Sequence, residues 1–175
     1  MSTQVQKYCL DANVLIQAWQ KYYSPKFCLD YWKLLNELGR NKMIFLPQIV
    51  FVEITHTEDD LAEWLKRSEI QKHKIDESVT QCLKRIYDKN PVHKYLVDNT
   101  KQRSLGDPWV IAHALKENAC VVTKEEKITA INTTKIKIPN VCDNMGVRCI
   151  NDFQLVEELN IQFSCALKTL KTLQT

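Results

Sequence analysis

Short apolar segments that alternate with longer amphipathic stretches constrain the fold of this chain more than any other feature. Segments of three or four apolar residues at 8–10, 43–46 and 120–122 are long enough for buried strands and too short for helices. Stretches with the apolar spacing of helices lie between them. Strands separated by helices predict a mainly parallel sheet with helices on both faces, which is a three-layer α/β/α sandwich.

Proline and glycine help to place the other elements. Proline is favoured in the first turn of a helix and glycine just past its end, so Pro47 indicates a helix start and Gly39 indicates a helix C-cap. We expect two further strands, at 136–138 and 147–150. We expect helices at 14–22, about 32–38, after Pro47, at 61–73, at 79–87, from Asp107 and from Asp152.

Length and composition indicate one globular domain. The chain has 175 residues, of which 45% are hydrophobic and 26% charged, and these values exclude a disordered or low-complexity protein. The presence of only 3 Gly and 5 Pro argues against an all-β sandwich, which needs many tight turns. We therefore expect residues 1–175 to form a single domain, with residues 152–175 as a C-terminal helical tail.

Targeting features and cysteine usage favour a cytoplasmic protein without a membrane anchor. No apolar run approaches the ~18 residues of a membrane span, and Asp11 and Asn13 interrupt the apolar N-terminal stretch that a secretory signal would need. The 7 Cys include no CxxC pair, so we expect reduced thiols rather than a zinc ribbon. Cys142 and Cys149 do not have the short paired spacing that structural zinc sites favour.

Positive charge gathers in the middle of the chain. Residues 64–103 hold 10 Lys+Arg and 5 Asp+Glu, whereas the two flanking segments together carry a net charge of −2. Such a segment either attracts phosphates or simply forms the solvated face of a helix. The candidates for contact with a nucleic-acid backbone are Lys84, Arg85, Lys101 and Arg103.

Acidic side chains stand where the predicted strands end. Asp11 follows the first apolar segment, and Glu53 lies on the helix after the second. Glu125 lies shortly after the third apolar segment, and Asp107 begins the helix that leads into that segment. Ligands of open parallel sheets bind beyond the carboxyl ends of the strands, so these four carboxylates are expected to converge. Two bare carboxylates about 4 Å apart repel by ~4 kcal/mol at an effective dielectric constant of about 20. The cluster therefore requires cations, and oxygen ligands favour Mg²⁺ or Mn²⁺.

Each acid also has a structural interpretation. Asp107 suits the N-cap of a helix, Asp11 suits a turn after a strand, and Glu125 suits a solvated helical turn. Glu53 lies in a strongly apolar segment, where a carboxylate is costly unless it is paired or bound to a metal, so a functional role is favoured there. Both interpretations stay open for the other three acids.

Four blocks of the chain resemble the PIN-domain nucleases, the fold of VapC-like toxins. The blocks are Tyr8–Ile16, Val50–Ile54, Gly106–Ala112 and Val121–Glu125, and their order and spacing cover about residues 8–150. The first and third blocks are the most specific. The chain is similar in particular to a PIN-like prokaryotic branch that also carries the Ile138–Cys142 segment.

The resemblance implies a role for each matching residue. The three acidic metal ligands of the family are matched by Asp11, Glu53 and Asp107. The small polar residues that support the site are matched by Asn13 and Thr123. Glu125 matches a fourth acid, which is usually Asp. Because Glu is one methylene longer, a direct ligand role for Glu125 is in doubt, and Glu126 competes for it.

The activity implied is that of a Mg²⁺- or Mn²⁺-dependent endoribonuclease, the toxin of a toxin–antitoxin pair. The substrate would be single-stranded or looped RNA, whose bases can be splayed and stacked. Trp109, next to Asp107, could stack such a base or pack in the core. Two other functions stay open, namely a PIN-like module that binds RNA or a partner without cleavage, and a DNA-directed, structure-specific nuclease.

The C-terminal tail carries an apolar pattern that fits a contact surface. Apolar residues follow an alternating spacing of three and four along 156–173, as in the seam of a coiled coil. The tail could therefore pack on the domain's own sheet or against a partner. The family resemblance implies both a homodimer and a small antitoxin partner.

Overall fold

The central feature of the fold is a five-stranded parallel sheet. The computed structural model describes residues 6–97, 105–129 and 136–164, and the strands within them are ordered β3-β2-β1-β4-β5. All four strand pairings are parallel. The strands are β1 (Tyr8–Leu10), β2 (Ile44–Pro47), β3 (Gln71–His73), β4 (Cys120–Val122) and β5 (Cys149–Ile150). Because β1 is central, its carboxyl end lies between those of β2 and β4.

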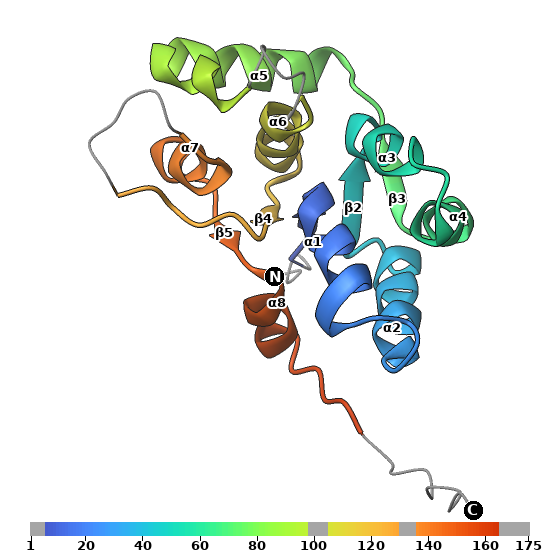
Figure 1. Cartoon of the computed structure of the whole chain (residues 1–175). Helices are drawn as coiled ribbons and strands as arrows, with labels where there is room; N and C mark the ends of the chain where they lie inside the picture. The colour runs from blue at the N-terminus through green and yellow to red at the C-terminus, as the bar shows by residue number, and fades with distance from the viewer. Residues whose placement is uncertain (1–5, 98–104, 130–135, 165–175) are drawn as a thin grey trace, which may run out of the picture.

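One face of the sheet is covered by two layers of helix. Figure 1 shows α6 and α7 against the sheet, with α5 packed on the outer side of α6. The short 3₁₀ helix Pro91–Leu96 follows α5. The bounds of the three α-helices are α5 (Glu77–Lys89), α6 (Asp107–Glu117) and α7 (Ile138–Met145).

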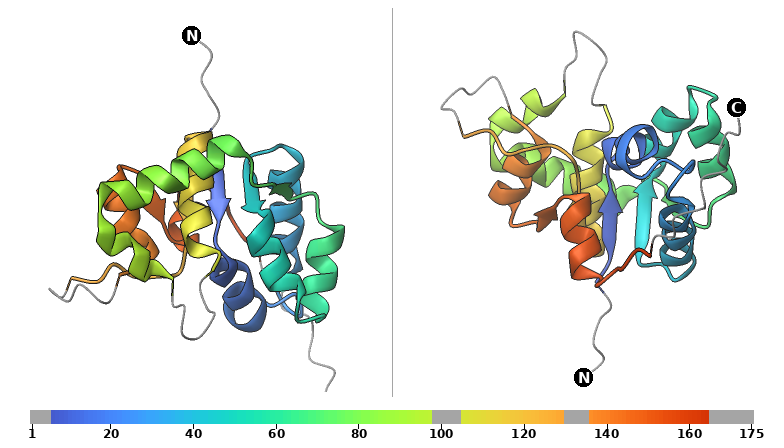
Figure 2. Two further views of the ribbon diagram at one scale, coloured as in Figure 1. Left: turned by 90° about the horizontal axis from the view of Figure 1, so that it is seen from above. Right: turned by 60° about the horizontal axis from the view of Figure 1, so that its bottom comes forward.

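The remaining helices cover the other face and the β3 edge. Figures 1 and 2 show α2 and α8 on the face opposite α6, while α3 and α4 stand beside β2 and β3. Their bounds are α2 (Leu29–Arg40), α3 (Gln48–Thr55), α4 (Asp60–Arg67) and α8 (Asp152–Glu158). The short α1 (Ala12–Gln17), which continues as the π-helical turn Ala18–Tyr22, follows β1. The predicted α/β/α sandwich is confirmed. Among the described helices, none has the length and apolar character that crossing a membrane requires.

The inner strands form because their side chains are apolar on both faces. Every residue of β1, β2 and β4 is buried, as expected for a parallel sheet that helices cover on both sides. Leu10, Phe45 and Val121 are among the side chains with almost no exposed surface. Burying each such side chain contributes about 1.5–3 kcal/mol. The core therefore fixes the position at which each inner strand ends.

Two predicted elements are wrong. The helix expected over 61–73 ends at Arg67, and β3 takes residues Gln71–His73. This edge strand has only half-buried polar side chains, so it lacks the apolar run that marks a buried strand. The strand expected at 136–138 is also wrong, since Ile138 begins α7 with Pro139 in its first turn.

Gly39 serves close packing rather than helix capping. It is the second-last residue of α2, and the C-cap is Asn41. A Cβ placed on Gly39 would lie 2.7 Å from the backbone N and Cα of Ile70. Real Cβ contacts are not that short, so only glycine allows the segment that leads into β3 to pass over α2.

The C-terminal helix is shorter than predicted. Asn151 caps α8 through a hydrogen bond from the backbone N–H of Gln154 (2.8 Å), and the helix ends at Glu158. Asn160 then takes a positive φ of 52°, and Phe163 packs on the ring of Tyr23 with a centroid distance of 5.5 Å. The rest of the predicted seam, residues 165–175, lies outside the described residues. A continuous helical seam over 156–164 is therefore ruled out.

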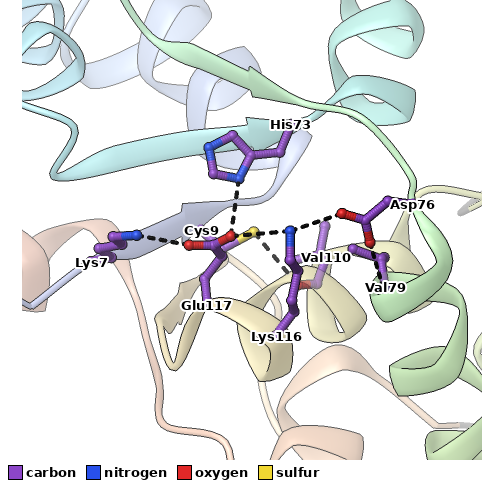
Figure 3. A network of polar contacts seen from close by, with 8 residues as sticks. All are labelled: Lys7, Cys9, His73, Asp76, Val79, Val110, Lys116 and Glu117. Carbon is purple, nitrogen blue, oxygen red and sulfur yellow. Dashed lines mark hydrogen bonds and ion pairs between the residues drawn. The ribbon is translucent and has the colours of Figure 1, made fainter.

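A polar network closes the end of β1 opposite to Asp11 (Figure 3). Lys7, just before β1, pairs with Glu117 at the last residue of α6 (2.7 Å). The neighbouring Lys116 pairs with Asp76 (3.0 Å), whose other carboxylate oxygen caps α5 at Val79 (2.9 Å). The network therefore ties β1, α5 and α6 together and leaves the first turn of α6 at the opposite, carboxyl end of the sheet.

Candidate active site

The central strand delivers Asp11 to the carboxyl edge of the sheet. Asp11 directly follows β1, and its backbone N–H continues the ladder by donating to the carbonyl of Val122 on β4 (3.0 Å). It precedes the short α1, but its side chain makes no capping hydrogen bond. Only 4% of the residue is exposed. The carboxylate is therefore held in the interior among side chains from other elements.

The loop after β4 supports Asp11 from one side. The buried hydroxyl of Thr123 donates to Oδ2 of Asp11 (2.7 Å) and accepts from the backbone N–H of Glu125 (3.1 Å). Asn13 Oδ1 accepts from the backbone N–H of Lys124 (2.9 Å). Both predicted supporting residues thus link the start of α1 to residues 123–125, at the beginning of the loop after β4.

The surroundings of Asp11 disfavour its negative charge. Burial raises the pKa of Asp11 to about 7, and the hydrogen bond from Thr123 opposes that rise. The negative charges of Glu125 and Glu53 raise the pKa of Asp11 further. These effects place both glutamates within electrostatic reach of Asp11. A cation at this point would relieve the repulsion.

Glu53 meets the start of α6. It lies on α3, and a Cβ placed on Gly106 would be 3.1 Å from its Oε2. Gly106 is the N-cap of α6 and Asp107 is its first residue, so the interpretation of Asp107 as the N-cap is wrong. Glu53 is exposed on α3, so the cost expected for a carboxylate in an apolar segment does not arise there, although partial desolvation raises the pKa of its carboxyl group. The structure thus sets Glu53 beside the turn that carries Asp107.

The fourth predicted acid is engaged by the start of α7. Glu125 Oε1 pairs with Nζ of Lys137 (2.7 Å), and Oε2 accepts from the backbone N–H of Ile138 (2.9 Å). The bond to Glu125 is the largest influence that raises the pKa of Lys137, and the charges of Asp107 and Asp11 add to it. Glu126 is exposed. A lysine that the sequence pattern does not single out thus lies within electrostatic reach of the acids.

A buried ion pair connects α8 to the same loop. Nζ of Lys124 pairs with Oδ1 of Asp152 (2.7 Å), which is fully buried at the first residue of α8. The ammonium group also lies over the rings of Phe153 (4.2 Å) and Tyr22 (4.9 Å). Sequence reasoning missed Lys124 and Asp152 because 28 residues separate them. An acid at a helix start and a lysine in a loop carry no pairing signal of their own.

Comparison with known proteins assigns the chain to a family. The family model described as Domain of unknown function (DUF4411) matches residues 8–163, which span every element described above. The chain belongs to DUF4411. No curated protein matches it.

The DUF4411 chain also has a structural neighbour. It is similar to a chain of the crystal structure of VapBC2 from Rickettsia felis bound to a DNA fragment from their promoter. The TM-score is 0.53 and the identity 16%, over 83% of this chain and 98% of that chain. At this identity the likeness shows the fold alone.

The donor chemistry of the DUF4411 site fits a hard divalent cation. The negative charges that act on Asp11 are the carboxylates of Glu125 and Glu53, and carboxylate oxygens are the preferred ligands of Mg²⁺ and Mn²⁺. In the described part of the chain, no three His, Cys, Asp or Glu side chains are grouped so as to hold a metal ion as they stand. Asp11 is buried and held by Thr123, and binding of a metal ion by the predicted acids would require side-chain adjustment.

The predicted nucleic-acid contacts that the structure describes lie on the outer helix or pack in the core. Lys84 and Arg85 are exposed on α5, in the outer helical layer. Lys101 and Arg103 lie outside the described residues. Trp109 is half-buried and packs against the core, which favours the packing role over base stacking.

Proposed function

We propose that this protein is a metal-dependent endoribonuclease of the PIN type that hydrolyses RNA phosphodiester bonds. The observation that carries the proposal is the buried Asp11 carboxylate at the carboxyl end of the central strand, whose pKa is raised to about 7 by burial and further by the negative charges of Glu125 and Glu53. A bound divalent cation would compensate this repulsion, and carboxylates with strongly perturbed pKa values cluster at functional sites.

The proposed roles follow from the contacts. Asp11, Glu53 and Asp107 would hold the divalent cation, and Thr123 orients Asp11 through their 2.7 Å hydrogen bond. When bound, such an ion neutralises charge on a phosphodiester and lowers the pKa of water, which supplies a nucleophile at neutral pH. Asn13 keeps the loop after β4 in register with α1 through Lys124.

The biological setting is part of the same proposal. The fold likeness to a chain of a VapBC2 complex supports a toxin–antitoxin role, with an antitoxin as partner. A homodimer and a cytoplasmic location also stay predictions from the sequence. We also propose that the RNA backbone is contacted by Lys84, Arg85, Lys101 and Arg103.

The experiment compares wild-type protein with Asp11→Asn on a set of single-stranded and hairpin RNAs in Mn²⁺ or Mg²⁺. We expect cleavage by wild type, loss of cleavage in EDTA, and a loss of about 100-fold or more in Asp11→Asn, since a ligand is removed from the charge-stabilising ion. Asp30→Asn, which removes an exposed acid that pairs with Lys33 on α2, serves as the matched control and should cleave like wild type.

Three results would lead elsewhere. Equal cleavage by wild type and Asp11→Asn would mean that this site is not responsible. Faster cleavage of flapped DNA than of RNA would favour the DNA-directed nuclease. RNA binding by folded protein without metal-dependent cleavage of any substrate would favour a non-catalytic module.

A further inference from the structure

The positive charge of Lys137 is built into the acidic site. Its ammonium group pairs with Glu125 at 2.7 Å, and 46% of the side chain remains exposed, so it can be reached by a substrate. The charges of Asp107 and Asp11 also favour the charged form of Lys137, so its ammonium group lies within electrostatic reach of two of the proposed metal ligands. Lys137 is held there because it directly precedes α7, whose first N–H binds the same carboxylate.

Both carboxylate oxygens of Glu125 already accept a hydrogen bond. Oε1 accepts from Lys137 and Oε2 accepts from the backbone of Ile138 (2.9 Å), and only 13% of the side chain is exposed. Each oxygen keeps a second lone pair, but a cation bound there would lie next to the Lys137 ammonium group, and two unit charges about 4 Å apart repel by ~4 kcal/mol at an effective dielectric constant of about 20. A second metal ion that depends on the fourth acid is therefore disfavoured in this chain.

We propose that the site takes a single divalent cation, and that the ammonium group of Lys137, anchored by Glu125, supplies the second positive charge that contacts the RNA phosphate. This inference rests on the proposed function, because it assigns the charges of that same site. An ammonium group has three N–H donors, so it can keep its bond to Glu125 and still donate to a phosphate oxygen. Glu125 then serves to position Lys137 rather than to ligate metal.

The test measures metal binding and cleavage in parallel. Mn²⁺ binding to the full chain is followed by calorimetry and by the electron paramagnetic resonance signal of free Mn²⁺. We expect one Mn²⁺ per wild-type chain and one per Glu125→Gln chain with similar affinity. In Lys137→Met, the loss of a repelling positive charge should tighten Mn²⁺ binding about tenfold.

Cleavage should change in the opposite direction. Single-turnover RNA cleavage by Lys137→Met is expected to fall by about 100-fold, the usual effect of removing one charge-stabilising donor. Lys137→Arg keeps the positive charge and should retain part of the cleavage activity. The matched control is Lys127→Met, which removes an exposed lysine paired with Asp143 in the same segment and should leave both measurements unchanged. Circular dichroism verifies that each variant is folded.

The outcomes separate this inference from the proposed function. Two Mn²⁺ per wild-type chain, loss of Mn²⁺ binding in Glu125→Gln, or cleavage by Lys137→Met at the rate of Lys127→Met would overturn it, whether or not the protein is a ribonuclease. Absence of any metal-dependent RNA cleavage by wild type would overturn the proposed function and this inference together.

Discussion

At the scale of single residues, Asp11 and Thr123 act as one unit. Asp11 is almost fully buried, and the Thr123 hydroxyl is the partner that most favours its charged form. The same hydroxyl accepts from the N–H of Glu125, so one oxygen atom both favours the charged form of Asp11 and holds the first residues of the loop after β4. The carboxylate would lose both kinds of support if the hydroxyl were removed.

Thr123→Val tests this unit because valine keeps the shape and removes the hydroxyl. We expect Mn²⁺ affinity and RNA cleavage to fall by about 10- to 100-fold, since a hydrogen bond to a charged group contributes about 1.5–3 kcal/mol. Thr123→Ser keeps the hydroxyl and should stay within a few-fold of wild type. Equal Mn²⁺ affinity in the valine and serine variants would show that the hydroxyl does not support the site.

At the scale of elements, α8 holds the loop after β4 against the sheet. The Lys124–Asp152 pair joins them, and aromatic rings from α8 and from the turn after α1 cover the ammonium group. The pair is nearly dry, since 14% of the lysine side chain and none of the aspartate is exposed. The short α8 is therefore part of the support of the acidic edge.

Asp152→Asn should destabilise the fold, because it leaves the buried Lys124 ammonium without its countercharge. Removing one partner of a buried pair costs about 3–5 kcal/mol, whereas an exposed pair contributes less than about 1 kcal/mol. Asp143→Asn, which removes the exposed partner of Lys127, is the matched control. Urea denaturation measures both, and a free energy of unfolding that falls equally in the two variants would contradict the role given to α8.

At the scale of the whole molecule, a buried histidine between the sheet and the outer helices makes stability depend on pH. His113 on α6 is fully buried, and neither ring nitrogen has a hydrogen-bond partner among the residues that the structure describes. Burial lowers the pKa of His113 to about 4, and the positive charges of His73 and Lys116 add to that effect. The opposing charges of Asp76 and Glu117 are weaker. The fold therefore holds this imidazole in its neutral form.

The free energy of unfolding should fall as the pH drops from about 6.5 to about 4. In that range the unfolded chain protonates His113 and the folded chain does not, so the loss approaches about 1.4 kcal/mol per pH unit. His113→Leu should remove this slope without loss of stability at pH 7, because an apolar side chain replaces unpaired polar atoms.

The difference between the two chains isolates the histidine. Asp11, whose pKa is raised, contributes a slope of the opposite sign, since its protonated form stabilises the fold at low pH and this stability is lost as the pH rises to about 7. That contribution is present in both chains and cancels. Urea denaturation at several pH values gives the difference, and parallel curves for wild type and His113→Leu would disprove the assignment.

The sequence by itself determined the parts of the protein that local chemistry fixes. Apolar runs such as Tyr8–Leu10 and Cys120–Val122 can only be buried strands, and the helices between them require parallel connections. The order of strands and acids along the chain then indicates one carboxyl edge, where Asp11 and Thr123 do meet.

Only the tertiary structure decided the features that depend on contacts distant in sequence. The residues of β3 are polar, and they form a strand because their backbone pairs with the free edge of β2. Gly39 has the local signal of a helix C-cap, but the structure shows that it is needed because the backbone of Ile70 passes close to it. Lys137 carries no local signal, and it joins the acids because the fold brings the start of α7 to Glu125. Such pairings follow from the packing of whole elements, which spacing along the chain does not encode.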